Sequence, residues 1–200
     1  MRVVIDDTPE ILTDISKFRK PYWVEVGSGG YGREPFDEWI HCDPHVPPAH
    51  HIEVKCYAWR LPLENGSVKK IYGQGMWEHL SYAQCDKAMA EWIRVLRPGG
   101  IIEFNFPPID HYIDRYNDGR ADWIFLRNAI WGWQKFHEDI HLSGWTASTM
   151  LGFLDKYKDV FEDIRVFPAY HITPGEIMEV DSYDAWDNGV HGWVRLLIKG

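Results

Sequence analysis

An α/β fold with a doubly wound, mostly parallel sheet is predicted for this sequence by three observations. Segments with the residue patterns of strands and helices alternate along the chain. One apolar segment, Tyr22 to Val26, runs directly into a glycine-rich turn. Another, Ile101 to Phe106, is apolar enough to lie in the middle of a sheet covered on both faces. At 200 residues, the chain is most simply a single domain, residues 1–200.

The first element is predicted to be a helix over residues 8–20. It begins with threonine, a favoured N-cap, and proline, which fits the first turn, and apolar residues follow at helical spacing. The first strand and its glycine turn come next. Six residues separate Gly32 from Trp39, and Pro35 is among them, so we expect a loop or a single turn there instead of a full helix.

Three strands are predicted next, over residues 39–43, 51–58 and 68–75, with a turn at 64–67 before the last of them. A helix follows over residues 82–96, because Ser81 to Gln84 forms a capping box. Its apolar residues share one face, at positions 82, 85, 89, 92 and 96. The Pro-Gly-Gly sequence at residues 98–100 ends this helix before the central strand.

The last third of the chain is predicted to hold a lid and an antiparallel edge. Residues 109–145 are rich in tryptophan and in charged residues, and we interpret them as a lid or acceptor insertion. Thr146 caps another helix, which turns residues 150, 151, 154 and 157 inward. Residues 161–172 and 192–199 can pair as two final strands, giving the sheet an antiparallel C-terminal edge. The connection at 173–190 is too long for a tight hairpin.

The composition limits the partners and the compartment. A formal net charge of −9, without a strong cluster among the 21 lysines and arginines, argues against a nucleic-acid binder. No apolar run approaches 18 residues and the start does not resemble a signal sequence, so we expect a cytoplasmic protein without a membrane partner. Cys42, Cys56 and Cys85 form neither a metal spacing nor a disulfide framework and are expected to be buried thiols. Nothing in the sequence indicates an oligomeric state.

The glycine turn indicates a nucleotide-cofactor site. Its bare backbone, from Gly27 to Gly32, lets a ligand approach closely, and an adenosine-bearing molecule fits this role. Asp43 ends the next strand, 16 residues after Gly27. An acidic side chain at that strand end can hold two ribose hydroxyls.

Five phrases in order along the chain carry a resemblance: Trp23 to Gly32, Trp39 to Asp43, Arg60-Leu-Pro62, Trp77-Glu-His-Leu80 and Arg94 to Gly100. Together they resemble the class I S-adenosylmethionine-dependent methyltransferases. The likeness is to the small predicted methyltransferases of the methyltransferase-domain 11 type, often associated with polysaccharide genes. It implies a Rossmann-like fold and S-adenosyl-L-methionine as cofactor, with S-adenosyl-L-homocysteine as product.

The resemblance also implies cofactor-binding residues. In that family an acidic-x-Gly-x-Gly loop lies beneath the methionine part of the cofactor, and Asp43 looks like its ribose carboxylate. The segment before Pro62 resembles the one that packs against adenine, although Tyr57 replaces the usual aspartate, so stacking by Tyr57 or Trp59 is an alternative way to hold the base. The complete set of expected cofactor-binding residues is Glu25, Gly27, Ser28, Gly29, Asp43, Tyr57, Ala58, Trp59, Gln74 and Gly75.

The expected acceptor is a small or carbohydrate-like molecule, methylated at oxygen. The sulfonium methyl group is already electrophilic, so the protein mainly has to align a nucleophile and exclude water. A base would still help a hydroxyl acceptor, and the candidates are His79, His137 and His141. For His79, and equally for Glu78, a purely structural role at the start of a helix stays open.

His137-Glu-Asp-Ile-His141 also fits the H-E-x-x-H pattern of zinc proteases. Asp139 occupies a spacer position, Gly144 closes any helix soon afterwards, and no third ligand follows in a recognisable motif. We therefore expect no metal site from this motif. An acceptor-side role and a solvated helical face are the readings that stay open.

Two other functions remain as alternatives. Gly27 to Gly32 formally fits the dinucleotide fingerprint G-x-G-x-x-G, which would make the protein a nicotinamide-dependent oxidoreductase, although the short gap before Trp39 leaves little room for the helix that such a site needs. The other alternative is a non-catalytic methyltransferase-like binding subunit, which Tyr57 in place of aspartate would suit.

Overall fold

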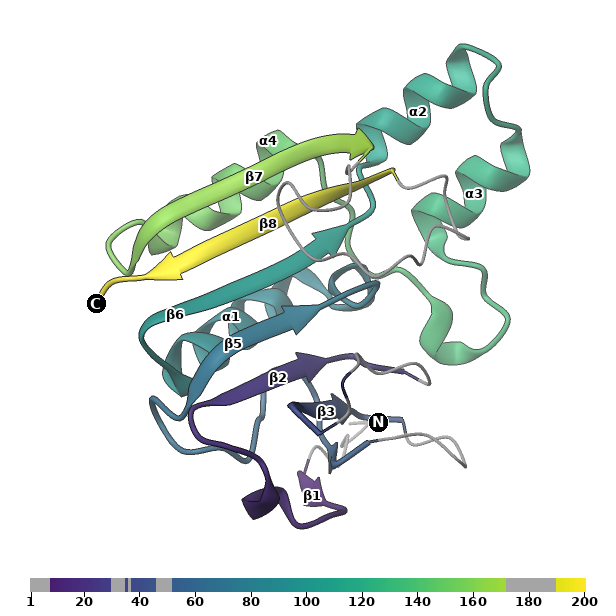
Figure 1. The fold of residues 1–200 in the computed structure, drawn as a ribbon. Coiled ribbons are helices and arrows are strands. Elements are labelled where there is room, and N and C mark those ends of the chain that lie inside the picture. The colour runs from purple at the N-terminus through teal and green to yellow at the C-terminus, as the bar shows by residue number, and fades with distance from the viewer. Residues whose placement is uncertain (1–7, 30–34, 36, 46–51, 172–189) are drawn as a thin grey trace.

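The computed structural model describes residues 8–29, 35, 37–45, 52–171 and 190–200. These residues form one eight-stranded sheet in the order β1-β4-β3-β2-β5-β6-β8-β7 (Figure 1). The strands are β1 (Glu10–Ile11), β2 (Tyr22–Val26), β3 (Trp39–Asp43), β4 (Val54–Lys55), β5 (Val68–Gly73), β6 (Leu96–Phe106), β7 (Phe161–His171) and β8 (Val190–Ile198). Four α-helices accompany them: α1 (Tyr82–Val95), α2 (Ile109–Asn117), α3 (Trp123–Trp131) and α4 (Ala147–Leu154).

The centre of the sheet is parallel and its ends are antiparallel. β4, β3, β2, β5 and β6 run parallel to one another, whereas β1 pairs antiparallel with β4, and β8 lies antiparallel between β6 and β7. The predicted α/β class, with a mostly parallel sheet and an antiparallel C-terminal edge, is confirmed. Because β2, β3, β5 and β6 point the same way, the turns that follow them meet at one edge of the sheet.

The main core lies between the sheet and the helices α1 and α4, which cover the same face (Figure 1). The predicted capping box is present: Ser81 accepts a hydrogen bond from Gln84 N, and Gln84 returns one to the Ser81 backbone. Trp92 and Met89 of α1 are fully buried against the central strands, while Tyr82, predicted to face inward, is 57% exposed. On the other face, Trp39, Tyr72 and Trp193 form a second, smaller cluster.

The predicted helix over residues 8–20 is wrong. β1 lies there instead, and its two residues pair with Val54 and Lys55. A single 3-10 turn follows at residues 15–17, capped by Asp14, whose side chain accepts from Ser16 N. Ile11 is 51% exposed and Leu12 38%, whereas Phe18 is buried in the main core, so only the later part of the apolar spacing that favoured a helix meets the core. Pairing with the edge of the sheet satisfies the backbone of this segment instead.

Other predicted elements differ in extent. The strand predicted over residues 51–58 is reduced to β4, while β5 ends at Gly73 and β6 already begins at Leu96. No helix joins β2 to β3 in the described residues, as expected from the short connection. In α4, Thr146 caps as predicted, but Leu151 is 47% exposed. The predicted connection at 173–190 falls almost entirely outside the described residues.

Two features of the composition can be compared with the structure. All three cysteines are buried and unpaired, which confirms the prediction of buried thiols. Across the described ranges, none of the helices is both long enough and apolar enough to cross a membrane.

Candidate functional site

A cavity of about 480 Å³ opens at the edge of the sheet where the parallel strands end. Its lining comes from the glycine turn after β2, here called the glycine wall, and from the segment after β5 together with the end of β6, here called the floor. The remaining lining, here called the aromatic wall, comes from α2, α3 and the loop that follows α3, and His191 of β8 also contributes. Of the predicted site residues, Glu25, Gly27, Ser28, Gly29, Gln74, Gly75, His79 and His141 line this cavity.

The glycine wall is held by the neighbouring strand. Gly27 N donates to Cys42 O at 2.8 Å, and Gly29 N donates to the Asp43 carboxylate at 2.8 Å. Gly27 and Gly29 both have positive φ angles, of 71° and 54°. A side chain at Gly27 would meet Met76 Cβ at 2.5 Å, whereas a Cβ at Gly29 would meet no atom within 4 Å. Gly27 is therefore required for packing, and Gly29 leaves open space beside the cavity.

Asp43 supports this wall from behind and is not itself among the lining residues. Its Oδ2 accepts from Gly29 N and its Oδ1 from His45 N, each at 2.8 Å. The side chain is buried, and this burial raises the pKa of Asp43 although both backbone donors oppose the change. Each carboxylate oxygen can accept more than one hydrogen bond, so Asp43 keeps the capacity to bind a hydroxyl group.

Three polar side chains of the cavity wall carry buried atoms without a hydrogen-bond partner among the described residues. They are Ser28 Oγ, Glu78 Oε2 and Asn105 Nδ2. The Oδ1 atom of Asn105 is engaged, because it accepts from Gly75 N at 2.8 Å. Leaving a buried polar atom unpaired costs about 1–3 kcal/mol, so three such atoms around one cavity indicate a site that binds a polar ligand.

A buried polar group next to the cavity joins β2, β3 and the segment before β4. The ring of His41 is fully buried, with Nδ1 2.9 Å from Glu53 Oε2 and Nε2 3.7 Å from Glu25 Oε2. Burial raises the pKa of Glu53, but the hydrogen bonds with the His41 ring and backbone outweigh it and leave this pKa below its ordinary value. Glu25 thus faces the cavity as part of a paired group.

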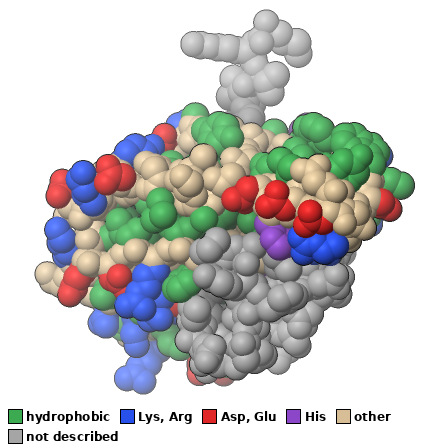
Figure 2. Space-filling model, turned by 90° about the horizontal axis from the view of Figure 1, so that it is seen from above, with side chains coloured by type: hydrophobic (Ala, Val, Ile, Leu, Met, Phe, Trp, Pro, Cys, Tyr) green, Lys and Arg blue, Asp and Glu red, His purple; other side chains and the backbone are tan. Residues whose placement is uncertain are grey.

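The aromatic wall is named after the side chains that it presents to the cavity. Tyr112 and Phe125 come from α2 and α3, and Trp133 and Phe136 come from the loop after α3. This region also exposes apolar side chains to the outside: Figure 2 shows hydrophobic side chains gathered at the end of the molecule where α2 and α3 lie. Flat aromatic faces suit a ring-shaped ligand.

His79 and His141 lie together at the floor of the cavity, with ring centroids 4.9 Å apart and ring planes at 87°. Burial lowers the pKa of His141, against the opposing charge of Glu78. His137 is exposed and does not line the cavity. The H-E-x-x-H residues do not share one helix face, because residues 137–139 form a short 3-10 turn and Ile140 is extended.

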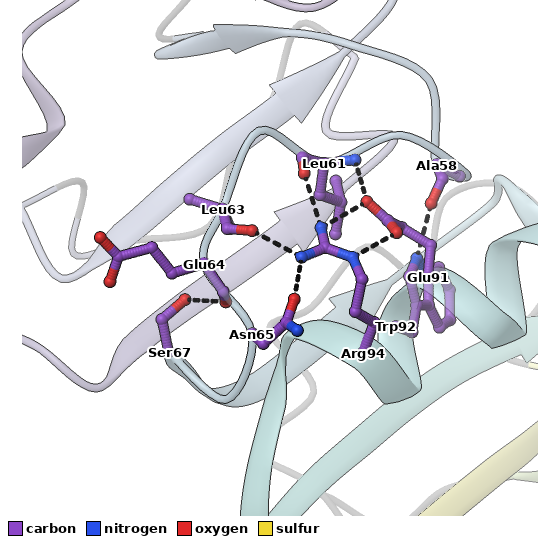
Figure 3. A network of polar contacts seen from close by, with 9 residues as sticks. All are labelled: Ala58, Leu61, Leu63, Glu64, Asn65, Ser67, Glu91, Trp92 and Arg94. Carbon is purple, nitrogen blue, oxygen red and sulfur yellow. Dashed lines mark hydrogen bonds and ion pairs between the residues drawn. The ribbon is translucent and has the colours of Figure 1, made fainter.

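The predicted adenine segment, Tyr57 to Trp59, lies next to Asp43, since Cys56 N donates to Asp43 O at 3.2 Å. Tyr57 and Trp59 stack on each other at 4.6 Å, and neither they nor Ala58 are among the lining residues. The loop is fastened to α1 (Figure 3): Arg94 donates to Leu61 O and Leu63 O, and Trp92 Nε1 donates to Ala58 O.

Sequence reasoning missed several cavity residues. Asn105 was detectable, because it is a polar residue one position before the end of the predicted strand over residues 101–106. The aromatic side chains that line the cavity come from residues 109–145, the segment predicted to be a lid, but the sequence did not single them out. Glu78 was considered together with His79, but its proximity to His141 depends on a contact between distant segments, which sequence spacing does not reveal.

Part of the chain matches a known protein family. Residues 32–104 match a family model described as a methyltransferase domain. A comparison with curated proteins gives no match.

Solved structures with the same fold include a methyltransferase from Thermotoga maritima described as a possible histamine N-methyltransferase. It has 17% identity and a TM-score of 0.56, over 90% of this chain and 82% of that chain.

A second structure is the Burkholderia thailandensis 1,6-didemethyltoxoflavin-N1-methyltransferase, solved with S-adenosylhomocysteine. It has 12% identity and a TM-score of 0.52, and the match covers 90% of this chain and 71% of that chain. An Archaeoglobus fulgidus methyltransferase has 12% identity and a TM-score of 0.51, and the match covers 89% of this chain and 86% of that chain. The family match over residues 32–104 agrees with the predicted methyltransferase class, and these structures confirm the predicted fold.

Proposed function

We propose that this protein transfers a methyl group from S-adenosylmethionine to an oxygen atom of a small, carbohydrate-like acceptor bound in the cavity described above. The observation that carries the proposal is the position of the open glycine turn. It shares the cavity with buried, unpartnered polar atoms, with aromatic side chains and with the imidazoles of His79 and His141.

The glycine side of the cavity fits the cofactor. Gly29 and Gly75 both have positive φ angles, and a Cβ at either position would meet no atom within 4 Å. Bare backbone of this kind admits a ligand to close range. Ser28 Oγ and Asn105 Nδ2 supply unpaired polar atoms to the same space. We assign the methionine part of the cofactor to these residues, the ribose to Asp43 and the base to the Tyr57–Trp59 segment.

When bound, S-adenosylmethionine supplies a methyl group that bonds to an acceptor oxygen, while the electron pair of the breaking C–S bond stays on sulfur and the acceptor loses its proton. His79 and His141 are suited to this side of the reaction, because burial keeps His141 in its neutral, proton-accepting form. His137 lies outside the cavity and has no part in the proposed chemistry.

Residues 109–145 form the acceptor wall in this proposal. The aromatic rings of Tyr112, Phe125, Trp133 and Phe136 offer apolar faces, and α2 and α3 contribute to the cavity lining. Sugar rings and other flat small molecules pack well on such faces. The enclosed volume of about 480 Å³ suits a small acceptor beside the cofactor's methyl group.

Calorimetry with S-adenosylhomocysteine tests the proposal. Two glycines make a matched pair: Gly29 and Gly119 both have positive φ and no atom within 4 Å of the place a Cβ would take, but only Gly29 lines the cavity. We expect the wild-type protein and Gly119→Leu to bind the ligand and Gly29→Leu to lose binding. Absence of wild-type binding would favour a non-catalytic binding subunit, and binding of a nicotinamide dinucleotide in its place would favour an oxidoreductase.

A further inference from the structure

Glu78, His79 and His141 form a compact cluster at the floor of the cavity. One potential ligand atom from each side chain lies within 4.8 Å of the other two. Glu78 and His79 come from the short 3-10 turn after β5, and His141 comes from the loop after α3, 62 residues further along the chain. Two imidazoles and one carboxylate are a ligand set that binds divalent transition metals in proteins.

The hydrogen bonds of the two imidazoles engage Nδ1 of each ring and leave Nε2 available to bind a metal ion. His79 Nδ1 lies 3.2 Å from Ile140 O, and His141 Nδ1 lies 3.1 Å from Ala129 O. A carbonyl oxygen can only accept, so each Nδ1 must carry the proton. The neutral ring then has its lone pair on Nε2. A backbone carbonyl that fixes the tautomer in this way is the usual support of a metal-binding histidine.

The carboxylate gives a second, independent indication. Glu78 is 6% exposed, it lines the cavity, and its Oε2 has no hydrogen-bond partner among the described residues. A buried carboxylate oxygen without a partner is unfavourable, because it has lost its hydration without gaining a hydrogen bond. A cation bound between it and the imidazoles would compensate this charge.

The backbone holds the three residues in place. Leu142 N and Ser143 N both donate to Glu78 O, at 2.8 and 3.1 Å. These two bonds fasten the loop that carries His141 to the turn that carries Glu78 and His79. The ligand atoms are therefore brought together by main-chain contacts and not by flexible side chains alone, which favours binding because little further ordering is needed.

We propose that Glu78, His79 and His141 bind one divalent transition metal ion, of the kind represented by Zn²⁺, with an open coordination position directed into the cavity. Three protein ligands and one open position are typical of catalytic zinc. The site differs from the H-E-x-x-H motif, because it uses His141 but neither His137 nor Glu138.

The role of this ion rests on the proposed function. An acceptor hydroxyl bound at the open position would lose its proton more easily, because a bound divalent cation lowers the pKa of a coordinated oxygen. The two imidazoles would then act as ligands, and the proton would leave an oxygen already bound to the ion. Metal binding itself does not depend on the transfer reaction and can be tested alone.

The test uses the full chain, freed of metal with a chelator and then titrated with Zn²⁺ and with Co²⁺ as a spectroscopic probe. We expect one ion per chain, with the Co²⁺ absorption of a site that has nitrogen ligands. His141→Ala and Glu78→Gln should weaken binding by about 100-fold or more, in line with the sensitivity of metal sites to their ligands. The matched control is His137→Ala, which removes an exposed histidine of the same motif and should leave the affinity unchanged.

Several results would overturn the proposal: no stoichiometric Zn²⁺ or Co²⁺ binding to the wild-type chain, or a loss in His137→Ala as large as in His141→Ala. X-ray absorption on the zinc-loaded wild type requires no variant, and it should show two imidazole nitrogens and a carboxylate oxygen at about 2.0–2.2 Å. A zinc coordination shell without imidazole nitrogen would contradict the assignment of His79 and His141 as ligands. Calorimetry with S-adenosylhomocysteine on the metal-free chain separates this outcome from the proposed function, because it measures cofactor binding in the absence of the ion.

Discussion

Asp43 holds the glycine turn in place and is the residue that we propose for the ribose of the cofactor. Its two carboxylate oxygens accept from Gly29 N and His45 N, so the side chain fixes the glycine turn that lines the cavity. The same carboxylate was predicted from the sequence to hold ribose hydroxyls. The structure places it directly behind the turn, which is compatible with both tasks because each oxygen can accept a second hydrogen bond.

Replacing Asp43 with alanine is expected to weaken S-adenosylhomocysteine binding by about 1–3 kcal/mol, the cost of leaving buried hydrogen-bonding groups unpaired. Calorimetry measures the affinity, and thermal unfolding shows whether the variant is folded. Asp37→Ala is the control, because Asp37 is an exposed acidic residue. A folded Asp43→Ala variant with wild-type affinity would remove Asp43 from the cofactor site.

The three cysteines should be unreactive in the folded protein. Burial raises the pKa of Cys85 to about 12, and the contact with Cys56 together with burial raises the pKa of Cys42 well above its ordinary value. Only the thiolate is an effective nucleophile. At a pH of about 8.5, near the ordinary thiol pKa, mass spectrometry should detect no alkylation by iodoacetamide before unfolding and three modified cysteines after it. Rapid modification of the native chain would show that a thiol is exposed.

At the scale of elements, His41 joins the strands next to the cavity. Its ring lies between Glu25 on β2 and Glu53, which precedes β4. Two buried carboxylates share one imidazole, so the loss of the ring would leave negative charge without a partner. This group therefore fixes the position of Glu25 in the cavity wall as well as the packing of β3 against its neighbours.

His41→Leu, which retains apolar volume but removes both polar contacts, is expected to lower the free energy of unfolding by about 3–5 kcal/mol. Urea denaturation measures the change. His45→Ala provides the comparison, because the side chain of His45 is half exposed and its contact with Glu138 is worth at most about 1 kcal/mol. Equal stability of the two variants would show that the buried group contributes no more than a surface ion pair.

Arg94 has a similar role between α1 and the loop that precedes β5 (Figure 3). Its guanidinium donates to Leu61 O, to Leu63 O and to both oxygens of Glu91. The planar group with its five N–H donors reaches these acceptors together, which a lysine ammonium cannot do in the same geometry.

We expect Arg94→Ala to reduce the free energy of unfolding by about 2 kcal/mol, the scale of hydrogen bonds to a charged group. Arg94→Lys should recover less than half of this loss. In parallel, Arg120→Ala removes an exposed arginine that pairs with Asp118, and it should change stability by less than about 1 kcal/mol. Full recovery of stability in Arg94→Lys would show that the positive charge matters and the planar arrangement of N–H donors does not.

At the scale of the whole molecule, the parts that the sequence predicted are those with a local cause. The glycine turn, the Ser81 capping box and the apolar strand β6 each follow from residues that are adjacent in the chain. The first helix was mispredicted because its apolar spacing is also local, whereas the pairing of β1 with β4 depends on residues more than 40 positions away. Propensity is a weak guide where such pairing competes.

The site followed the same rule. The glycine wall could be predicted because a strand, a turn and a carboxylate occur at a regular spacing. The pairing of His79 with His141 could not, because it is made by main-chain bonds from Leu142 and Ser143 to Glu78. The H-E-x-x-H motif directed attention to His137 as the partner of His141, but the structure places His79 beside His141.

The central claim is that the cavity between the glycine turn and the aromatic wall holds the methyl donor. A crystal structure of the chain grown with S-adenosylhomocysteine tests it most directly. We expect ligand density against Gly29, with polar contacts to Ser28 and Asn105 and the ligand's sulfur directed toward His79 and His141. Density at another place on the chain, with this cavity filled by side chains, would contradict it.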